Sequence, residues 1–316
     1  MGFSQKLNKP LKKILIGRDI QLIDKLVFAI TNGNSSGWVI GNKLRNLAYG
    51  KKRAISKEPF IFIGGFPRSG TTLLQNFLDQ YKEIITTEIE VNVLQDIKSE
   101  KTLKERTKKG KREKGFMFND KEIRELDLGE DIIEDAEKIA EKAKDKYRGK
   151  RVLLKQPKHV FFLKDIFKHF TNSKFIHVIR DGRDATMSQR YYCLQENQKE
   201  HPYEWCCRQW VTAIKRGRKF RENPRYIEVY YENLIKNPEK ELQRILDFLG
   251  LEKKAQIKYT KKNGKNFPNH PNVGKPLDKS VIGKGKRKMT KKDKKIFNKI
   301  ARKELIKLGY VKDNNR

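Results

Sequence analysis

The sequence predicts an α/β protein of three layers, in which helices cover both faces of a central parallel sheet. Three observations predict this fold. Four short apolar runs are continuous rather than alternating, as in strands buried on both faces, and they occupy residues 60–63, 151–155, 174–180 and 225–231. A helical pattern follows each run, which is typical of βαβ units. A glycine-bearing turn, GGFPRSG at residues 64–70, joins the first run to its helix.

The composition is that of a folded protein with a highly charged surface. The chain has 316 residues, of which 36% are hydrophobic and 35% charged. This length suits one large α/β domain, and the apolar runs are compact enough to build its core. Lysine and arginine outnumber aspartate and glutamate by 73 to 39, which gives a net charge of +34. Such a field attracts anions, but it does not distinguish nucleotides from nucleic acids, glycans, acidic peptides or lipids.

The organisation of the chain is expected to be one main domain with two additions. We expect an N-terminal basic extension at residues 1–55, a domain at residues 56–316 and a mainly helical, Lys/Glu-rich insertion at about residues 96–150. Residues 11–30 are basic and partly amphipathic, which favours packing onto the domain over peripheral contact with an anionic membrane.

Features of localisation point to the cytoplasm. No apolar run approaches the ~18 residues of a membrane span, and we expect no secretory signal at the start. The three cysteines, Cys193, Cys206 and Cys207, lack metal-ligand spacing, which favours a reducing compartment. We therefore expect a cytoplasmic protein, with peripheral membrane association through the N-terminal extension as an alternative.

Two further segments have clear patterns. Residues 237–250 predict a helix on the sheet, with Asn237 as its cap, Pro238 in its first turn and Gly250 at its end. Its apolar face is Leu242, Ile245, Leu246 and Leu249. Residues 261–288 are rich in Gly, Pro, Asn and Lys, and predict a long loop.

The turn after the first strand has the chemistry of an anion-binding site. Backbone N–H groups at a glycine turn, followed by a helix N-terminus, bind phosphate oxygens. Gly65 and Gly70 have the spacing of a nucleotide triphosphate loop, so the fold is P-loop-like, but Thr71 stands where that loop has lysine. The cation is Arg68, and Lys155 ends the second run where a metal-binding aspartate is expected. The pattern therefore predicts an anion site without a metal.

A second anion site is predicted at the end of the third run. Arg180 ends that strand, and Ser188 follows about two helical turns later. Arginine binds phosphate bidentately, and serine donates a further hydrogen bond. Ion pairing at the surface is the simpler interpretation for Arg183 with Asp184, but not for Arg180. His177 alternates within the strand and is expected to be a core residue.

These motifs resemble those of the sulfotransferases that use 3'-phosphoadenosine 5'-phosphosulfate (PAPS). Residues 67–73 (PRSGTTL) resemble the 5'-phosphosulfate loop, and residues 174–188 resemble the 3'-phosphate motif. Residues 229–234, 246–250 and 280–286 also resemble the family, closest to its tyrosylprotein branch and bacterial relatives. The resemblance implies sulfuryl transfer from PAPS, without a metal, to a hydroxyl of a protein tyrosine, a carbohydrate or a small molecule. The donor-binding residues that it implies are Arg68, Ser69, Gly70, Thr71, Thr72, Leu73, Arg180, Ser188, Tyr231, Lys284 and Lys286.

Catalytic roles follow from the same resemblance. In-line attack by a hydroxyl needs a base and cations near the transferred group, and we assign the cations to Arg68 and Lys155 and a hydrogen-bond donor to Ser280. The tyrosylprotein branch uses a glutamate shortly after the first helix. Counting without gaps reaches Ile89, so Glu90 or Glu88 serves only with a shift of one residue, and we prefer Glu90. His159 is the alternative, as in the cytosolic sulfotransferases.

Two other classes of function share features with this sequence. A P-loop nucleotide kinase or related transferase would require lysine at position 71 and a carboxylate for a metal. A nucleic-acid-binding protein on a degenerate sulfotransferase scaffold is suggested by lysine clusters at residues 108–114 and 284–288. Aromatic residues are not interleaved with these clusters as base-stacking platforms require, which argues against nucleic acid as the partner. An acidic peptide or a carbohydrate is preferred.

Overall fold

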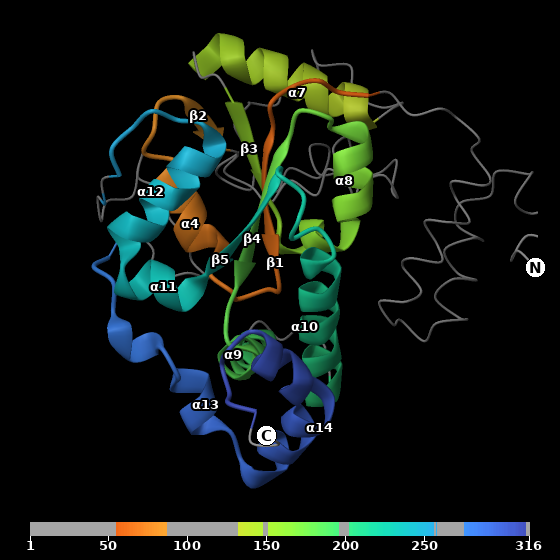
Figure 1. Ribbon diagram of the computed structural model, residues 1–316, viewed down its shortest axis with the longest axis vertical. Coiled ribbons are helices and arrows are strands. Elements are labelled where there is room, and N and C mark those ends of the chain that lie inside the picture. The colour runs from red at the N-terminus through yellow and green to blue at the C-terminus, as the bar shows by residue number, and fades with distance from the viewer. Residues whose placement is uncertain are drawn as a thin grey trace, which may run out of the picture. The chain divides into compact units, whose positions relative to one another are not determined.

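A five-stranded parallel sheet lies at the centre of the fold (Figure 1). The computed structural model describes residues 55–86, 132–147, 151–195, 202–255, 257 and 275–313, all of which fall within one compact unit, Ala54–Arg316. The strand order is β2-β3-β1-β4-β5. The strands are β1 (Ile61–Gly65), β2 (Ile84–Thr86), β3 (Arg151–Lys155), β4 (Lys174–Ile179) and β5 (Tyr226–Tyr230).

The register places the ends of three strands side by side. Ile63 of β1 pairs with Lys155 of β3, and Gly65 of β1 pairs with Val178 of β4. Because all strands are parallel, the loop after β1, Lys155 and Arg180 gather at one edge. That edge, the carboxyl ends of the strands, is where open α/β sheets bind ligands.

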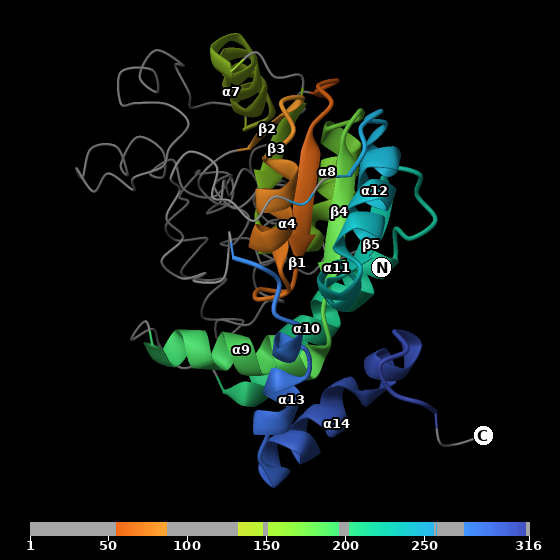
Figure 2. The ribbon, with the colours of Figure 1, turned by 90° about the vertical axis from the view of Figure 1, so that its left-hand side faces the viewer.

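Helices cover both faces of the sheet, as three layers require (Figures 1 and 2). One face carries α4 (Thr71–Leu78), α11 (Tyr231–Lys236) and α12 (Pro238–Leu249). The other carries α8 (Leu163–His169), α10 (Tyr203–Arg218) and the 3-10 helix η3 (Pro157–Phe162). The predicted fold class is therefore confirmed.

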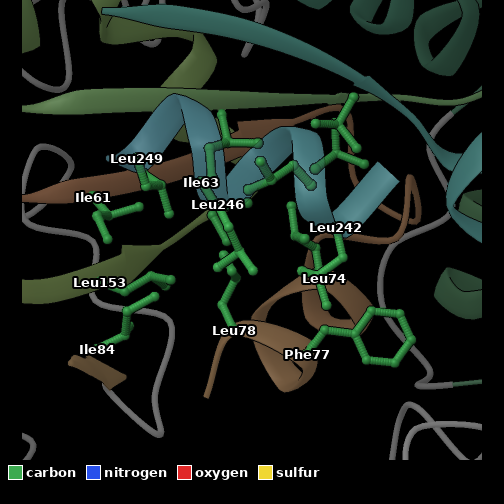
Figure 3. Packing of buried hydrophobic residues seen from close by; sticks show 14 of the residues in the cluster. Ile61, Ile63, Leu74, Phe77, Leu78, Ile84, Leu153, Leu242, Leu246 and Leu249 are labelled. Carbon is green, nitrogen blue, oxygen red and sulfur yellow. The ribbon is translucent and has the colours of Figure 1, made fainter. Parts of the chain in front are cut away.

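The core between the sheet and α4 and α12 follows from the sequence periodicity (Figure 3). Side chains of a strand point alternately to its two faces, so Ile61 and Ile63 enter this core while Phe62 packs under the opposite face against Phe170. The predicted helix 238–249 is confirmed, and its four-residue apolar face is fully buried. Gly250 ends it in the left-handed conformation, with φ of 68°, whereas Asn237 caps it without a side-chain hydrogen bond.

The remaining helices lie mostly at the ends of the sheet (Figure 2). Near the carboxyl ends of the strands are α9 (Gly182–Gln195), α13 (Lys284–Lys288) and α14 (Lys291–Lys307). At the opposite end is α7 (Ile132–Tyr147), which accounts for the described part of the predicted helical insertion. Within the described ranges, no helix combines the length and apolar character needed to cross a bilayer.

Several sequence predictions can be compared with these elements. The four predicted strands are present, with ends shifted by at most two residues, but β2 was not predicted because three residues are too short to produce a pattern. The loop predicted at 261–288 is wrong at η5 (Lys279–Val281) and α13, while residues 258–274 are outside the described ranges. The basic extension, also outside them, stays a prediction.

The buried histidine of β4 is a core residue, as predicted. His177 is fully buried, and its Nδ1 lies 2.6 Å from the hydroxyl oxygen of Tyr226. Its Nε2 has no hydrogen-bond partner among the described residues. Burial, reinforced by the charge of Arg218, lowers the pKa of His177 to about 3. The ring therefore stays neutral in the folded protein over the ordinary pH range.

This lowered pKa predicts a loss of stability in mild acid. An unfolded histidine has a pKa of about 6.5, so between about pH 6.5 and pH 3 the unfolded chain binds a proton that the folded chain does not. The free energy of unfolding should fall with pH in that window, by about 1.4 kcal/mol per pH unit from this residue at mid-window. In urea unfolding at pH 7 and pH 5, His177→Gln should lose less stability on acidification than the wild type. Equal losses would contradict this account.

Candidate active site

The turn between β1 and α4 is held in a conformation that aims its backbone at one point. Arg68 has φ of 66° and Gly70 has φ of 98°, so both lie in the left-handed region, which is uncommon for an arginine. Such outliers concentrate at ligand-binding sites. α4 begins immediately afterwards at Thr71, so the N–H groups of its first turn, which have no partner within the helix, face the same turn. The hydroxyl-bearing side chains of Thr71 and Thr72 are both buried there.

Tyr231 packs directly against the turn. A Cβ on Gly70 would overlap the ring of Tyr231, so glycine is required here for close approach as well as for its φ angle. The guanidinium carbon of Arg180 lies 4.5 Å from the centroid of the same ring. Tyr231 thus contacts both predicted anion sites and supports Arg180 in a fixed position. Tyr231 is among the donor-binding residues that the family resemblance implies.

Arg180 joins the two strand ends. Its Nη1 donates a hydrogen bond of 2.9 Å to the carbonyl oxygen of Arg68, although 112 residues separate them in the chain. Its own carbonyl oxygen accepts from Nε1 of Trp210 at 3.1 Å. The β1–α4 turn and the end of β4 are therefore in direct contact.

Two polar atoms at this junction fit an anionic ligand. The hydroxyl oxygen of Ser69 and Nε of Arg180 are buried, and neither has a hydrogen-bond partner among the described residues. A buried polar atom without a partner costs free energy, which a hydrogen bond to a ligand oxygen would recover. The two orphans lie on residues of the two predicted phosphate sites, so the chemistry of the junction fits the phosphates of PAPS.

The turn that follows Arg180 is braced by buried carboxylates. Glu232 accepts the N–H of Asp181 at 2.9 Å and the hydroxyl of Tyr310 at 2.7 Å, and burial raises the pKa of Glu232. Arg183 forms a bidentate ion pair with Asp181, whose nearest separation is 2.5 Å. The surface pairing expected for Arg183 with Asp184 is therefore wrong in its partner and its burial. The β4–α9 turn brings Asp181 back onto Arg183 and leaves Asp184 facing elsewhere.

Lys155 and His159 lie on opposite faces of the sheet. Lys155 is buried at the carboxyl end of β3, on the same side of the strand as Leu153, which belongs to the core beneath α4. This places it on the face where the β1–α4 turn continues into α4. His159 is fully buried on the other face, and its ring centroid lies 5.3 Å from that of Phe62. These are the surroundings of a core residue.

The other predicted residues are distributed around the junction. Ser188 is partly exposed within α9, and Leu73 packs on the core beneath α4. Lys284 and Lys286 are exposed in α13. Ser280 donates from its hydroxyl to Asp278 at 2.7 Å, and the hydrogen bonds from Ser280 lower the pKa of Asp278. Glu88 and Glu90 lie outside the described residues, so the identity of the base stays a prediction.

Three contributors to the site were not predicted. Tyr192 lies beneath Arg68, with the guanidinium carbon 4.9 Å from its ring centroid. Glu232 holds the turn after Arg180, and Asp184 binds the segment around α13. Tyr192 follows Ser188 by one helical turn on α9, which is a local signal for the first, whereas the other two depend on contacts between distant segments that no local pattern contains.

The fold and the junction together define a three-layer α/β protein in which a glycine turn and a strand-end arginine meet at the carboxyl edge of a parallel sheet. A family model described as "Sulfotransferase family" matches residues 59–255, which is more than half of the chain. The chain belongs to this family. The match includes the β1–α4 turn, Lys155, Arg180 and Tyr231, but not α13.

Individual relatives agree with this assignment. Protein-tyrosine sulfotransferase A of Caenorhabditis elegans is 30% identical over 208 residues, covering 61% of this chain and 50% of the relative. The protein-tyrosine sulfotransferase of Drosophila melanogaster is 30% identical over 229 residues, covering 70% and 43%. The chain thus spans about half the length of these relatives. The sulfotransferase domain of the Synechococcus PCC 7002 olefin synthase shares the fold, with a TM-score of 0.54 at 19% identity, over 79% of this chain and 96% of that domain.

Proposed function

We propose that this protein is a PAPS-dependent sulfotransferase that transfers a sulfuryl group to a hydroxyl acceptor. The observation that carries the proposal is the hydrogen bond from Arg180 to the carbonyl of Arg68, which joins a 5'-phosphate-type turn to a strand-end arginine. A nucleotide with phosphates at both ends of its ribose can engage the two sites together. The products are the sulfated acceptor and adenosine 3',5'-bisphosphate (PAP).

Some residues of the junction bind the nucleotide, and others stabilise the charge that develops during transfer. The turn at Ser69–Thr72 and the N-terminus of α4 bind the 5'-phosphate end, while Arg180, with Ser188 nearby in sequence, binds the 3'-phosphate. As the acceptor oxygen bonds to sulfur, the bond from sulfur to the bridging oxygen breaks and negative charge moves onto PAP. Arg68 and Lys155 are the cations that stabilise this charge, and Ser280 supplies a further hydrogen bond once its hydroxyl turns from Asp278 toward the nucleotide.

The proton of the acceptor hydroxyl goes to a base. Glu90 is our preferred base, with Glu88 as its neighbour and His159 as the alternative. The complete burial of His159 against Phe62 argues for one of the glutamates, because a base must reach the acceptor.

The acceptor that we propose is a tyrosine in an acidic peptide. The named activity of the two animal relatives supports a protein tyrosine. The net charge of +34 supports an acidic sequence around it, because a positive field concentrates anionic partners. A carbohydrate hydroxyl is the second acceptor to test. The location of the protein in the cell stays a prediction.

The test is a transfer assay with the purified chain and sulfur-labelled PAPS. Three acceptors are compared: a tyrosine peptide flanked by glutamates, the same peptide with phenylalanine for tyrosine, and a polysaccharide. We expect label on the tyrosine peptide alone, and equal rates with and without a chelator. Calorimetry should show binding of PAP.

The same assay separates the other functions. Turnover of ATP that requires magnesium would favour a kinase, and salt-sensitive binding of nucleic acid without any affinity for PAP would favour the nucleic-acid scaffold. Absence of PAP binding by the wild type would overturn the proposal. Binding of PAP with label on the polysaccharide would keep the enzyme class and change the acceptor.

A further inference from the structure

α13 is a short and strongly basic helix that depends on contacts outside itself. Four of its five residues are cations (Lys284, Lys286, Arg287 and Lys288), all of them exposed. A five-residue helix of like charges has little stability of its own. Its position must therefore come from the elements against which it packs.

A buried carboxylate on α9 supplies that position. Asp184 is 1% exposed, and both of its oxygens bind backbone N–H groups of the α13 segment. Oδ2 accepts from Gly283 at 2.6 Å, and Oδ1 accepts from Lys286 at 2.9 Å. Asp184 thus caps α13 from a different helix, across about a hundred residues of sequence.

The same carboxylate lies beside the arginine of the 3'-phosphate site. Oδ2 of Asp184 is 3.8 Å from Nη2 of Arg180, whose Nη1 is already bonded to the carbonyl of Arg68. Asp184 therefore contacts Arg180 on one side and the backbone of α13 on the other. A displacement of Asp184 would therefore change the positions of both Arg180 and α13.

The packing between α9 and α13 leaves no space for adjustment. A Cβ on Gly285 would lie 2.7 Å from Cα of Asp184 and 2.9 Å from the carbonyl oxygen of Arg183. Both neighbours are backbone atoms, so α13 would have to move away. Glycine at this position lets the basic helix dock directly on the first turn of α9.

The docked helix also fixes the segment that carries Ser280. Nη2 of Arg287 donates to the carbonyl of Ser280 at 2.8 Å, and its Nη1 donates to that of Ile282 at 3.1 Å. Residues 280–287 are thus linked internally and anchored to α9 through one carboxylate.

We propose that Asp184 is a positioning residue for the 3'-phosphate: it orients Arg180 and docks α13, so that the phosphate is bound by Arg180 together with the cations of α13. This inference rests on the proposed function, because it concerns the same donor nucleotide. In this proposal Asp184 does not contact the nucleotide itself and acts through Arg180 and α13. Both carboxylate oxygens of Asp184 accept hydrogen bonds from backbone donors.

The sign of the effect distinguishes this role from simple electrostatics. A carboxylate near a phosphate site repels the phosphate, so loss of its charge alone would strengthen binding. Loss of the docking contacts would weaken it. We expect the second effect to dominate, because Asp184→Asn replaces one acceptor oxygen by an amide N–H that faces a backbone donor.

The experiment compares two nucleotides that differ only in the 3'-phosphate. Calorimetry with PAP and with adenosine 5'-phosphate is carried out on the wild type, Asp184→Asn and Gly285→Ala. Gly285→Ala keeps every charge and displaces α13 only sterically. Glu304→Gln is the matched control, because Glu304 is a buried carboxylate of α14 that pairs with Lys307 at 3.3 Å. Thermal unfolding confirms that each variant is folded.

We expect both test variants to reduce the affinity for PAP by about tenfold, the scale of one charge-assisted hydrogen bond, and to leave that for adenosine 5'-phosphate within about twofold. Glu304→Gln should preserve the preference for PAP. If both nucleotides lose affinity equally, the role of Asp184 is only structural and the inference fails.

Tighter binding of PAP by Asp184→Asn would also overturn the inference. So would a Gly285→Ala variant that prefers PAP over adenosine 5'-phosphate as strongly as the wild type does. If Asp184→Asn does not fold, Gly285→Ala decides alone. A wild type that binds no PAP refutes the proposed function itself, whereas normal wild-type binding with unaffected variants refutes only the role of Asp184.

Discussion

Replacement of Arg180 by alanine is expected to weaken the binding of PAP by at least about tenfold, because a charge-assisted pair with phosphate is lost. The loss should be larger than that of one contact. The guanidinium also donates to the carbonyl of Arg68 and stacks on Tyr231, so its removal loosens the 5'-phosphate turn at the same time. Calorimetry with PAP measures the effect directly.

The control for this variant is another arginine that lies away from the junction. Arg208 forms an exposed ion pair with Glu204 on α10, at 2.6 Å, and exposed pairs contribute little to stability. Arg208→Ala should bind PAP as the wild type does. Unchanged affinity in Arg180→Ala would remove Arg180 from the 3'-phosphate site and, with it, the principal support for a donor held by two strand ends.

Replacement of Lys155 by methionine is expected to lower kcat by about a hundredfold, the scale at which one preorganised charge at the transition state contributes. Methionine preserves most of the buried volume, so the change removes charge rather than packing. PAP lacks the sulfuryl group, and its affinity should change much less than kcat. Steady-state kinetics combined with PAP titration separates the two quantities.

Lys174→Met provides the matched control. Lys174 begins β4 at the opposite edge of the sheet, where its amino group bonds the carbonyl of Phe248, and burial lowers its pKa. It is a partly buried strand lysine remote from the junction, so its replacement should leave kcat unchanged. Equal losses in the two variants would show that Lys155 acts through stability and not through catalysis.

The architecture was predictable because its signals are local. Continuous apolar runs mark buried parallel strands, and the run at 151–155 coincides with β3. The helix at 238–249 was predictable from its apolar face and from Gly250. β2 escaped because it has only three residues, and α13 escaped because its sequence has no apolar face and depends on Asp184 for its cap.

The candidate site was predictable in its residue types and in part of its geometry. The turn at residues 64–70 and the strand-end Arg180 could be proposed because parallel strands bring their carboxyl ends to one edge. The side chains with which the arginines pair could not be predicted. Arg183 pairs with Asp181 and not with Asp184, a choice made by the path of the β4–α9 turn.

The amino-acid sequence by itself determined four of the five strands, the glycine turn and the family, since each is encoded in neighbouring residues. Tertiary structure alone decided which groups meet across the chain: Arg180 with the carbonyl oxygen of Arg68, Tyr231 with Arg180 and Gly70, and Asp184 with the backbone of α13. Such pairs form where segments about a hundred residues apart in the sequence pack against each other. They are selected because buried charges and polar groups must be paired, and no local pattern specifies their partners.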